Sequence, residues 1–155
     1  MMDIIIAGII ACLAMDIFQR LLLATIGQPP SNWAVVGRWA FAVLRTARVH
    51  QPNIEDMPEA PRELPFGWFV HYAVGIGYAA VYAVLMRAGL LTSSLVDGLL
   101  FGIASVVVPW FFFLPVMGKG LMGKHTPAPV RVCTLAMANH CVFGVGMAAG
   151  FQLAV

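Results

Sequence analysis

Four long apolar segments constrain the fold of this chain more than any other feature of its sequence. They cover residues 4–26, 66–86, 95–114 and 130–155. A helix rises about 1.5 Å per residue and the hydrocarbon core of a bilayer is about 30 Å thick, so each segment is long enough to cross it. Of all residues, 61% are hydrophobic and 10% are charged, against about 25% charged in soluble domains. The sequence therefore predicts one all-α integral membrane domain over residues 1–155, with four transmembrane helices.

Charge and cysteine content exclude several classes of protein. The net charge is only +2 and the basic residues form no stripe, so a nucleic-acid partner is not expected. The three cysteines lie inside apolar segments, which indicates helix packing rather than a disulfide framework. No Lys or Arg precedes the first apolar run and Asp3 occupies that place, so we expect an uncleaved first span rather than a signal peptide.

The distribution of basic residues predicts the orientation in the membrane. The first connection between spans carries Arg38, Arg45, Arg48 and Arg62, and the third carries Lys119 and Lys124, with Arg131 at its edge. The second connection carries only Arg87. The positive-inside rule then places the first and third connections in the cytoplasm and both termini on the opposite side.

The first connection is predicted to contain a helix of its own. Gly27 and two prolines end the first span, Ser31 is a candidate N-cap, and residues 32–48 have an amphipathic pattern rich in Trp and Arg. Such a helix suits the headgroup layer of a membrane. Residues 50–64 hold three prolines and four acidic residues, which predicts a loop or lid that Pro65 ends.

Three further local signals concern the later spans. Gly89 is expected to end the second span, and Ser93 or Ser94 to cap the third. Pro109 lies inside the third span and predicts a kink there.

Few polar residues interrupt the apolar segments, and the ones expected to be buried are Asp16, His71, Asn139 and His140. An ionisable side chain at membrane depth costs several kcal/mol unless it is paired, so such residues are candidate functional groups. Counting from the cytoplasmic ends of the spans, Asp16 and His140 lie about 15 Å deep and His71 about 8 Å deep. This agreement predicts a shared polar pocket that opens to the cytoplasm.

Further residues are assigned to the mouth of this predicted pocket. Arg38 is the expected counter-charge of Asp16, with Trp39 beside it, and Arg131 is its competitor. Tyr72 follows His71 and joins the candidate set. The alternative interpretation is that Asp16 merely ties helices together through an Arg or His partner.

The third connection is a second candidate site, for an anion. Its candidate residues are Gly118, Lys119, Gly120 and Thr126. Glycines expose backbone N–H groups, which can form an anion-binding concavity beside a lysine. Glycine-rich turns between helices are also common without any ligand, so both interpretations stay open.

A metal or haem site is a further alternative, and no cofactor is predicted. Asp16, His71 and His140 would form a two-histidine, one-carboxylate set, and the two histidines would be the haem ligands. The chain has no HxxxH or CxxC pair to support either site.

Several short motifs, taken in order, resemble those of an uncharacterised bacterial four-span membrane family, domain of unknown function twenty-nine thirty-eight. They are Met15-Asp16, Gly37-Arg38-Trp39, Gly67-Trp68, His71-Tyr72, Gly75, Met117-Gly118-Lys119-Gly120, Thr126-Pro127-Ala128-Pro129, His140 and Phe143-Gly144-Val145-Gly146. The resemblance covers nearly the whole chain. It implies a small protein of the bacterial inner membrane, and it carries no catalytic assignment.

Three functional hypotheses follow. The first is a binding or transport protein that uses the predicted pocket; transport would require a homo-oligomer, since four spans rarely enclose a pore alone. The second is an accessory subunit of a larger membrane complex. The third is an intramembrane enzyme acting on a lipid or quinone, with His140 as a base oriented by Asp16, and Arg38 or Lys119 holding an anionic group.

Overall fold

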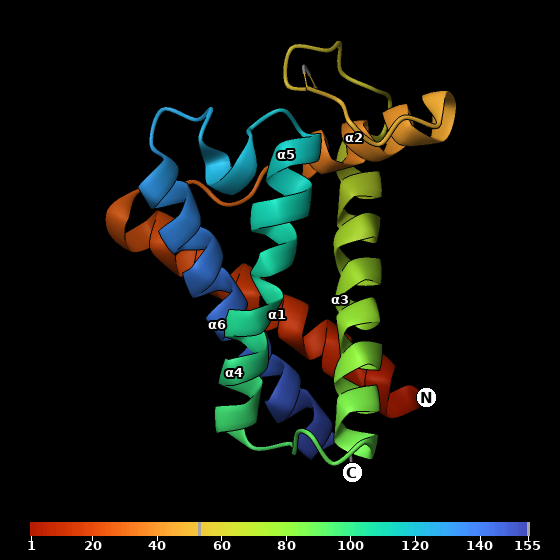
Figure 1. Ribbon diagram of the computed structural model, residues 1–155, viewed down its shortest axis with the longest axis vertical. Coiled ribbons are helices and arrows are strands. Elements are labelled where there is room, and N and C mark those ends of the chain that lie inside the picture. The colour runs from red at the N-terminus through yellow and green to blue at the C-terminus, as the bar shows by residue number, and fades with distance from the viewer. Residues whose placement is uncertain (53, 155) are drawn as a thin grey trace. The chain divides into compact units, whose positions relative to one another are not determined.

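The structure is a computed structural model that describes residues 1–52 and 54–154. Its helices, in chain order, are α1 (Met2–Ile26), α2 (Trp33–Thr46), α3 (Glu63–Arg87), α4 (Leu95–Ser105), η1 (Pro109–Phe113), α5 (Leu114–Val116), η2 (Leu121–Gly123) and α6 (Pro129–Leu153) (Figure 1). The described residues form helices and connecting segments, with no strand among them. The predicted all-α fold is confirmed.

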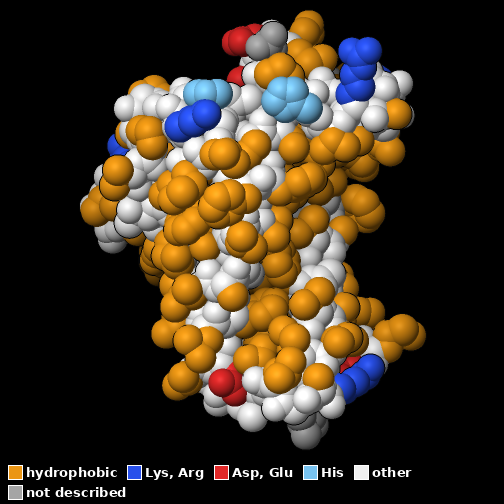
Figure 2. Space-filling model, viewed as in Figure 1, with side chains coloured by type: hydrophobic (Ala, Val, Ile, Leu, Met, Phe, Trp, Pro, Cys, Tyr) orange, Lys and Arg blue, Asp and Glu red, His pale blue; other side chains and the backbone are white. Residues whose placement is uncertain are grey.

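Four helical stretches are long and apolar enough to cross a membrane. They are Met2–Ile26, Glu63–Arg87, Leu95–Val116 and Pro129–Leu153. Many of their large apolar side chains are exposed, among them Leu13, Phe69 and Leu100. Figure 2 shows one face of the molecule, on which hydrophobic side chains predominate and charged ones are few. Such a surface is suited to lipid, so the four predicted transmembrane helices are confirmed.

The first two helices end and begin close to the predicted positions. Gly27 follows α1 in the left-handed region (φ 69°), and its N–H donates to Leu23 O, as expected of a glycine C-cap. The cap of α2 is Asn32 rather than the predicted Ser31, because the Asn32 side chain accepts from the N–H groups of Ala34 and Val35. Helix α2 ends at Thr46, two residues before the predicted end.

The start of α3 corrects one prediction. The helix begins at Glu63, three residues early, and Pro65 lies inside its first turn instead of ending the preceding loop. A proline is tolerated there because the first-turn N–H groups have no intrahelical acceptor.

The helical geometry of the third span changes near Pro109, where a kink was predicted. The α-helix α4 ends at Ser105, residues 107–108 are helical again, and the π-helix η1 begins at Pro109. At its other end the predicted cap is confirmed, because Ser94 Oγ accepts a hydrogen bond of 3.1 Å from the N–H of Asp97. Helix α6 ends at Leu153, and the last residue of the predicted span, residue 155, lies outside the described residues.

The chain divides into two compact units. Unit 1 combines Met1–Ser31, Tyr72–Ser105 and the segment from Met137 onward, and so contains α1, α4 and most of α3 and α6. Glycines bring its helices together. Gly8 lies against the backbone of Ile76, Gly150 lies against Ala7, and Gly98 lies against Gly144. These small residues allow close packing of α1 on α3 and of α6 on α1 and α4.

Unit 2 combines Asn32–His71 with Val106–Ala136. Its small core contains Val35, Ala42 and Ile54, with Trp39 and Met117 packed against them. Helix α2 crosses the first turns of α3 (Figure 1), and Gly37 faces Gly67 at this crossing. In unit 2 the first connection between spans therefore packs against the third connection.

Candidate functional site

The structure joins two predicted site residues, Asp16 of α1 and Tyr72 of α3, within unit 1. The Tyr72 hydroxyl donates to Asp16 Oδ2 over 3.1 Å, across 56 positions of sequence. Both side chains are partly buried. Asp16 lies about 15 Å from the end of α1 at Ile26, and Tyr72 about 13 Å from the start of α3. A carboxyl group and a phenol therefore meet deep inside the membrane-spanning helices.

Helix packing explains why this pair forms. Cys12 of α1 lies against Gly75 of α3, where the absence of a Cβ leaves room for the sulfur. Asp16 follows Cys12 by one turn and Tyr72 precedes Gly75 by one turn, so both side chains extend the same interface. Sequence depth alone could not show this contact, because it depends on how each helix is rotated about its axis.

One turn beyond Asp16, Gln19 holds a buried polar group that sequence reasoning missed. Its side chain is only 4% exposed. Gln19 Oε1 accepts a hydrogen bond of 2.6 Å from the N–H of Ser31, which fixes the orientation of the amide. Gln19 Nε2 is buried, and none of the described residues accepts a hydrogen bond from it. Such an unsatisfied donor costs about 1–3 kcal/mol in a protein interior, so an acceptor is expected there.

Asn139 supplies an unsatisfied acceptor on α6. It lies on the same side of α6 as Gly146 and Gly150, the glycines that contact α1, so it faces α1. Asn139 Oδ1 is buried, and no donor among the described residues reaches it. Among the described residues of unit 1, Gln19 Nε2 is thus a buried donor and Asn139 Oδ1 a buried acceptor without a partner, close along the chain to Asp16 and His140.

The ring of His140 is hydrogen-bonded to Ser105 and not to Asp16, the residue that orients it in the enzyme hypothesis. Its Nδ1 lies 2.8 Å from Ser105 Oγ, and Ser105 Oγ also donates to Gly102 O over 2.8 Å. Because the serine has one hydrogen to give, the Nδ1 of His140 carries a proton when both bonds form. The hypothesis that Asp16 orients His140 as a base therefore has to accommodate Ser105 as the residue bonded to Nδ1.

Ser105 was absent from the predicted set, although a signal for it exists. Proline at 109 has no N–H, so the carbonyl of Ser105, four residues earlier, loses its usual helical donor. The Tyr78 hydroxyl donates to that carbonyl over 3.4 Å. A backbone carbonyl within a membrane span must be satisfied internally, and Tyr78 does so here.

We predict that Tyr78→Phe lowers the free energy of unfolding by about 1–2 kcal/mol, because it leaves the Ser105 carbonyl without this donor. Thermal unfolding in detergent measures the loss. The matched control is Tyr72→Phe, which removes a hydroxyl that donates to the Asp16 carboxylate rather than to a backbone carbonyl. Equal stability of Tyr78→Phe and the wild type would contradict this role.

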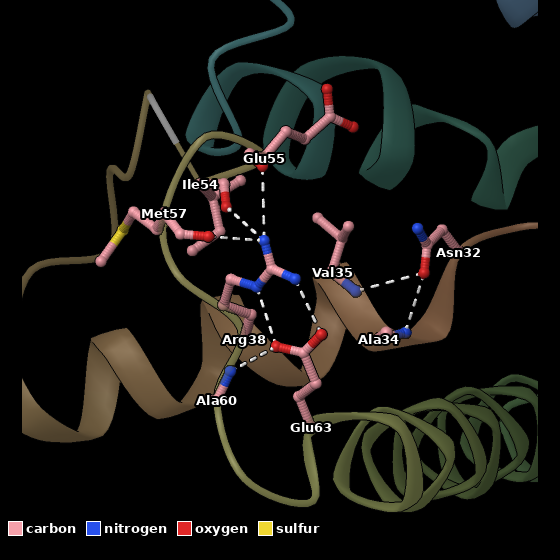
Figure 3. A network of polar contacts seen from close by, with 9 residues as sticks. All are labelled: Asn32, Ala34, Val35, Arg38, Ile54, Glu55, Met57, Ala60 and Glu63. Atoms are coloured by element: carbon pink, nitrogen blue, oxygen red, sulfur yellow. Dashed lines mark hydrogen bonds and ion pairs between the residues drawn. The ribbon is translucent and has the colours of Figure 1, made fainter.

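In unit 2 the counter-charge of Arg38 is Glu63, not the predicted Asp16. Nε and Nη2 of Arg38 donate to the two carboxylate oxygens of Glu63, each over 2.8 Å (Figure 3). Nη1 of Arg38 points to the carbonyls of Ile54, Glu55 and Met57, the last at 2.8 Å. The hydrogen bonds to Glu63 raise the pKa of Arg38 above its ordinary value, so the guanidinium stays charged. Arg38 therefore fastens the first connection between spans to the start of α3.

The remaining aromatic and histidine candidates also lie in unit 2. The rings of His71 and Trp33 stack with centroids 4.0 Å apart, and Trp68 meets His71 edge-on at 5.8 Å. The indole N–H of Trp39 donates to Val49 O over 2.9 Å. His71 is thus part of an aromatic cluster where α2 crosses α3, with 7% of its surface exposed.

The third connection uses its predicted anion-binding groups within unit 2. Lys119 Nζ forms an ion pair of 2.9 Å with Glu55, in the first connection. The N–H groups of Gly118 and Lys119 donate to the carbonyls of Pro115 and Leu114. Gly120 lies against His125, and the Thr126 hydroxyl donates to Gly123 O. These contacts are those of a tightly folded turn.

One known protein family matches nearly the whole chain. Residues 5–153 match the family described as "Protein of unknown function (DUF2938)". The chain belongs to this family. The match confirms the family resemblance of the sequence motifs, and its range includes the position of every candidate residue of this DUF2938 protein. No curated protein and no solved structure matched the chain.

The metal alternative receives no support from side-chain positions in this DUF2938 protein. Within residues 1–52 and 54–154, no three His, Cys, Asp or Glu side chains form a group that could hold a metal ion. The set of Asp16, His71 and His140 therefore remains a prediction from the sequence alone.

Proposed function

We propose that this protein lies in the bacterial inner membrane with both termini on the non-cytoplasmic side. The support comes from unit 2, where the first and third connections touch. The N–H of Gln51 donates to Val116 O over 2.7 Å, and Glu55 pairs with Lys119. Two connections in contact lie on the same side of a membrane, and these two carry most of the basic residues. The positive-inside rule then assigns that side to the cytoplasm.

Its proposed function is to bind, or to transport, a small polar ligand at the membrane-embedded face of α1. The observation that carries this proposal is the buried, unsatisfied Gln19 amide one turn from the Asp16–Tyr72 pair. A purely structural clasp would satisfy its own donors and acceptors, since an unsatisfied polar group is costly inside a membrane. Here a donor is left at Gln19, and an acceptor at Asn139.

These groups define the chemistry of the proposed ligand. Asp16 favours a positive charge or a hydrogen-bond donor, and Tyr72 adds a hydroxyl that both donates and accepts. Gln19 Nε2 requires an acceptor on the same ligand, or a water molecule. A small ammonium compound that also carries an oxygen, such as an amino alcohol or an amino acid, meets all three requirements.

The test is a thermal-shift screen of the detergent-purified protein with amino alcohols, amino acids, alkylammonium salts and alkali-metal chlorides. A ligand at 100 times its Kd is expected to stabilise the wild type by about 2.7 kcal/mol. The effect should be lost in Asp16→Asn and survive in Asp56→Asn, the same substitution at an exposed position of the first connection.

Two outcomes would contradict the proposal. Stabilisation that persists in Asp16→Asn would place the binding site elsewhere. A protein that none of these compounds stabilises, and that carries a second polypeptide in native mass spectrometry, would instead be an accessory subunit. Pairs of small residues can also hold the subunits of a membrane complex together, but Gly98 and Gly102, and Gly146 and Gly150, contact helices inside unit 1.

A further inference from the structure

Charge is divided unequally between the two units. Unit 2 contains seven Lys and Arg and four Asp and Glu, a net charge of +3, whereas unit 1 contains two and three, a net charge of −1. A net positive charge on one unit attracts anionic partners. Such attraction requires that the charge is exposed and is not neutralised inside unit 2.

Two ion pairs within unit 2 each neutralise one basic and one acidic side chain. Arg38 pairs with Glu63 and Lys119 pairs with Glu55. Outside these two pairs, unit 2 exposes the basic side chains of Arg45, Arg48, Arg62 and Lys124. The acidic ones outside the pairs are Asp56 and Glu59. The excess positive charge of unit 2 is therefore carried by exposed side chains, which we call the basic rim.

The basic rim lies next to apolar surface and to the ends of spans. Leu44, beside Arg45, is 73% exposed, and Val49, beside Arg48, is 42% exposed. Arg62 immediately precedes α3. Exposed apolar side chains among basic ones are typical of segments that lie in the headgroup layer, with the apolar groups in the lipid and the charges at phosphate level.

We propose that the basic rim binds the headgroups of anionic phospholipids. Arginine suits this role because its planar guanidinium binds phosphate oxygens through two parallel hydrogen bonds. The end of α2 is the centre of the site, because Arg45 and Arg48 lie three residues apart there with Leu44 next to them. The proposal is independent of the ligand proposed for Asp16, which lies in unit 1.

The experiment is native mass spectrometry of the full-length protein in detergent. It compares phosphatidylglycerol with phosphatidylcholine carrying the same acyl chains, at equal concentration. The wild type is expected to retain phosphatidylglycerol about tenfold better. The variant Arg45→Gln/Arg48→Gln should lose most of this preference and still bind phosphatidylcholine as before. Added salt should weaken the preference of the wild type, because ions screen exposed charges.

Single substitutions show which arginine provides the preference for phosphatidylglycerol. Arg48→Gln should lower retention of phosphatidylglycerol about threefold, whereas Arg87→Gln, which changes an exposed arginine of unit 1, should leave it unchanged. Melting temperatures equal to that of the wild type confirm that each variant is folded. Equal loss in both single variants, or no preference in the wild type, would overturn the proposal. So would inorganic phosphate that displaces the lipid at a similar concentration, because the surface would then be a site for soluble anions.

Discussion

Gly67→Ala is expected to disrupt unit 2 more than any other single methyl group added to this chain. At the crossing of α2 and α3, a Cβ on Gly67 would overlap the carbonyl oxygen of Trp33. Backbone cannot move aside as the end of a flexible side chain can, so the two helices must separate. Overpacking of this kind costs about 3 kcal/mol or more. We expect a melting temperature lower by on the order of 10 °C, together with altered fluorescence of Trp33 and Trp68.

The same helix provides the control. Gly77 also lies in α3, but a Cβ there would meet no atom within 4 Å. Gly77→Ala should therefore leave the structure intact and stabilise it by up to about 1 kcal/mol, because alanine favours the helix. A Gly67→Ala protein as stable as Gly77→Ala would show that α2 does not pack against α3 as described.

Arg38→Gln is the second substitution with a large expected effect. It removes five hydrogen bonds and leaves the buried Glu63 carboxylate without its charged partner. Removing one member of a buried pair costs about 3 kcal/mol, because the other charge remains in a poorly hydrated place. We expect the first connection to detach, and trypsin cleavage after Arg48 and Arg62 to become faster.

Two further variants separate charge from geometry at this position. Arg38→Lys keeps the positive charge but cannot reach both Glu63 oxygens and three carbonyls at once, so an intermediate loss is expected. Arg45→Gln removes an exposed arginine of the same helix and should change stability by less than about 0.5 kcal/mol. If Arg38→Gln behaved like Arg45→Gln, Arg38 would not fasten the loop.

The features that the sequence predicted correctly are those that depend on neighbouring residues. Segment length and polarity predicted the four spans, Gly27 predicted the end of α1, and Pro109 marked the place where the third span changes its helical geometry. The errors were local too. Asn32 competes with Ser31 for the same cap, and Pro65 is equally acceptable before a helix or in its first turn.

The candidate site was predictable only in part. Polarity within the spans identified Asp16, His71, Asn139 and His140 as unusual, and Tyr72 joined them through its neighbour His71. Which of them meet depends on helix rotation, and a rotation of 100° per residue makes adjacent residues face different partners. Asn139 and His140 show this directly, since Asn139 faces α1 and His140 bonds Ser105 of α4.

The four-span, all-α membrane fold could be predicted from the sequence, because crossing a bilayer requires long apolar helices that satisfy their own backbone. The partners became visible only in the folded chain: Glu63 for Arg38, Tyr72 for Asp16 and Ser105 for His140. Each pair joins residues 25 or more positions apart. Glycine contacts between helices bring them together, and no periodicity within one segment specifies which faces will meet.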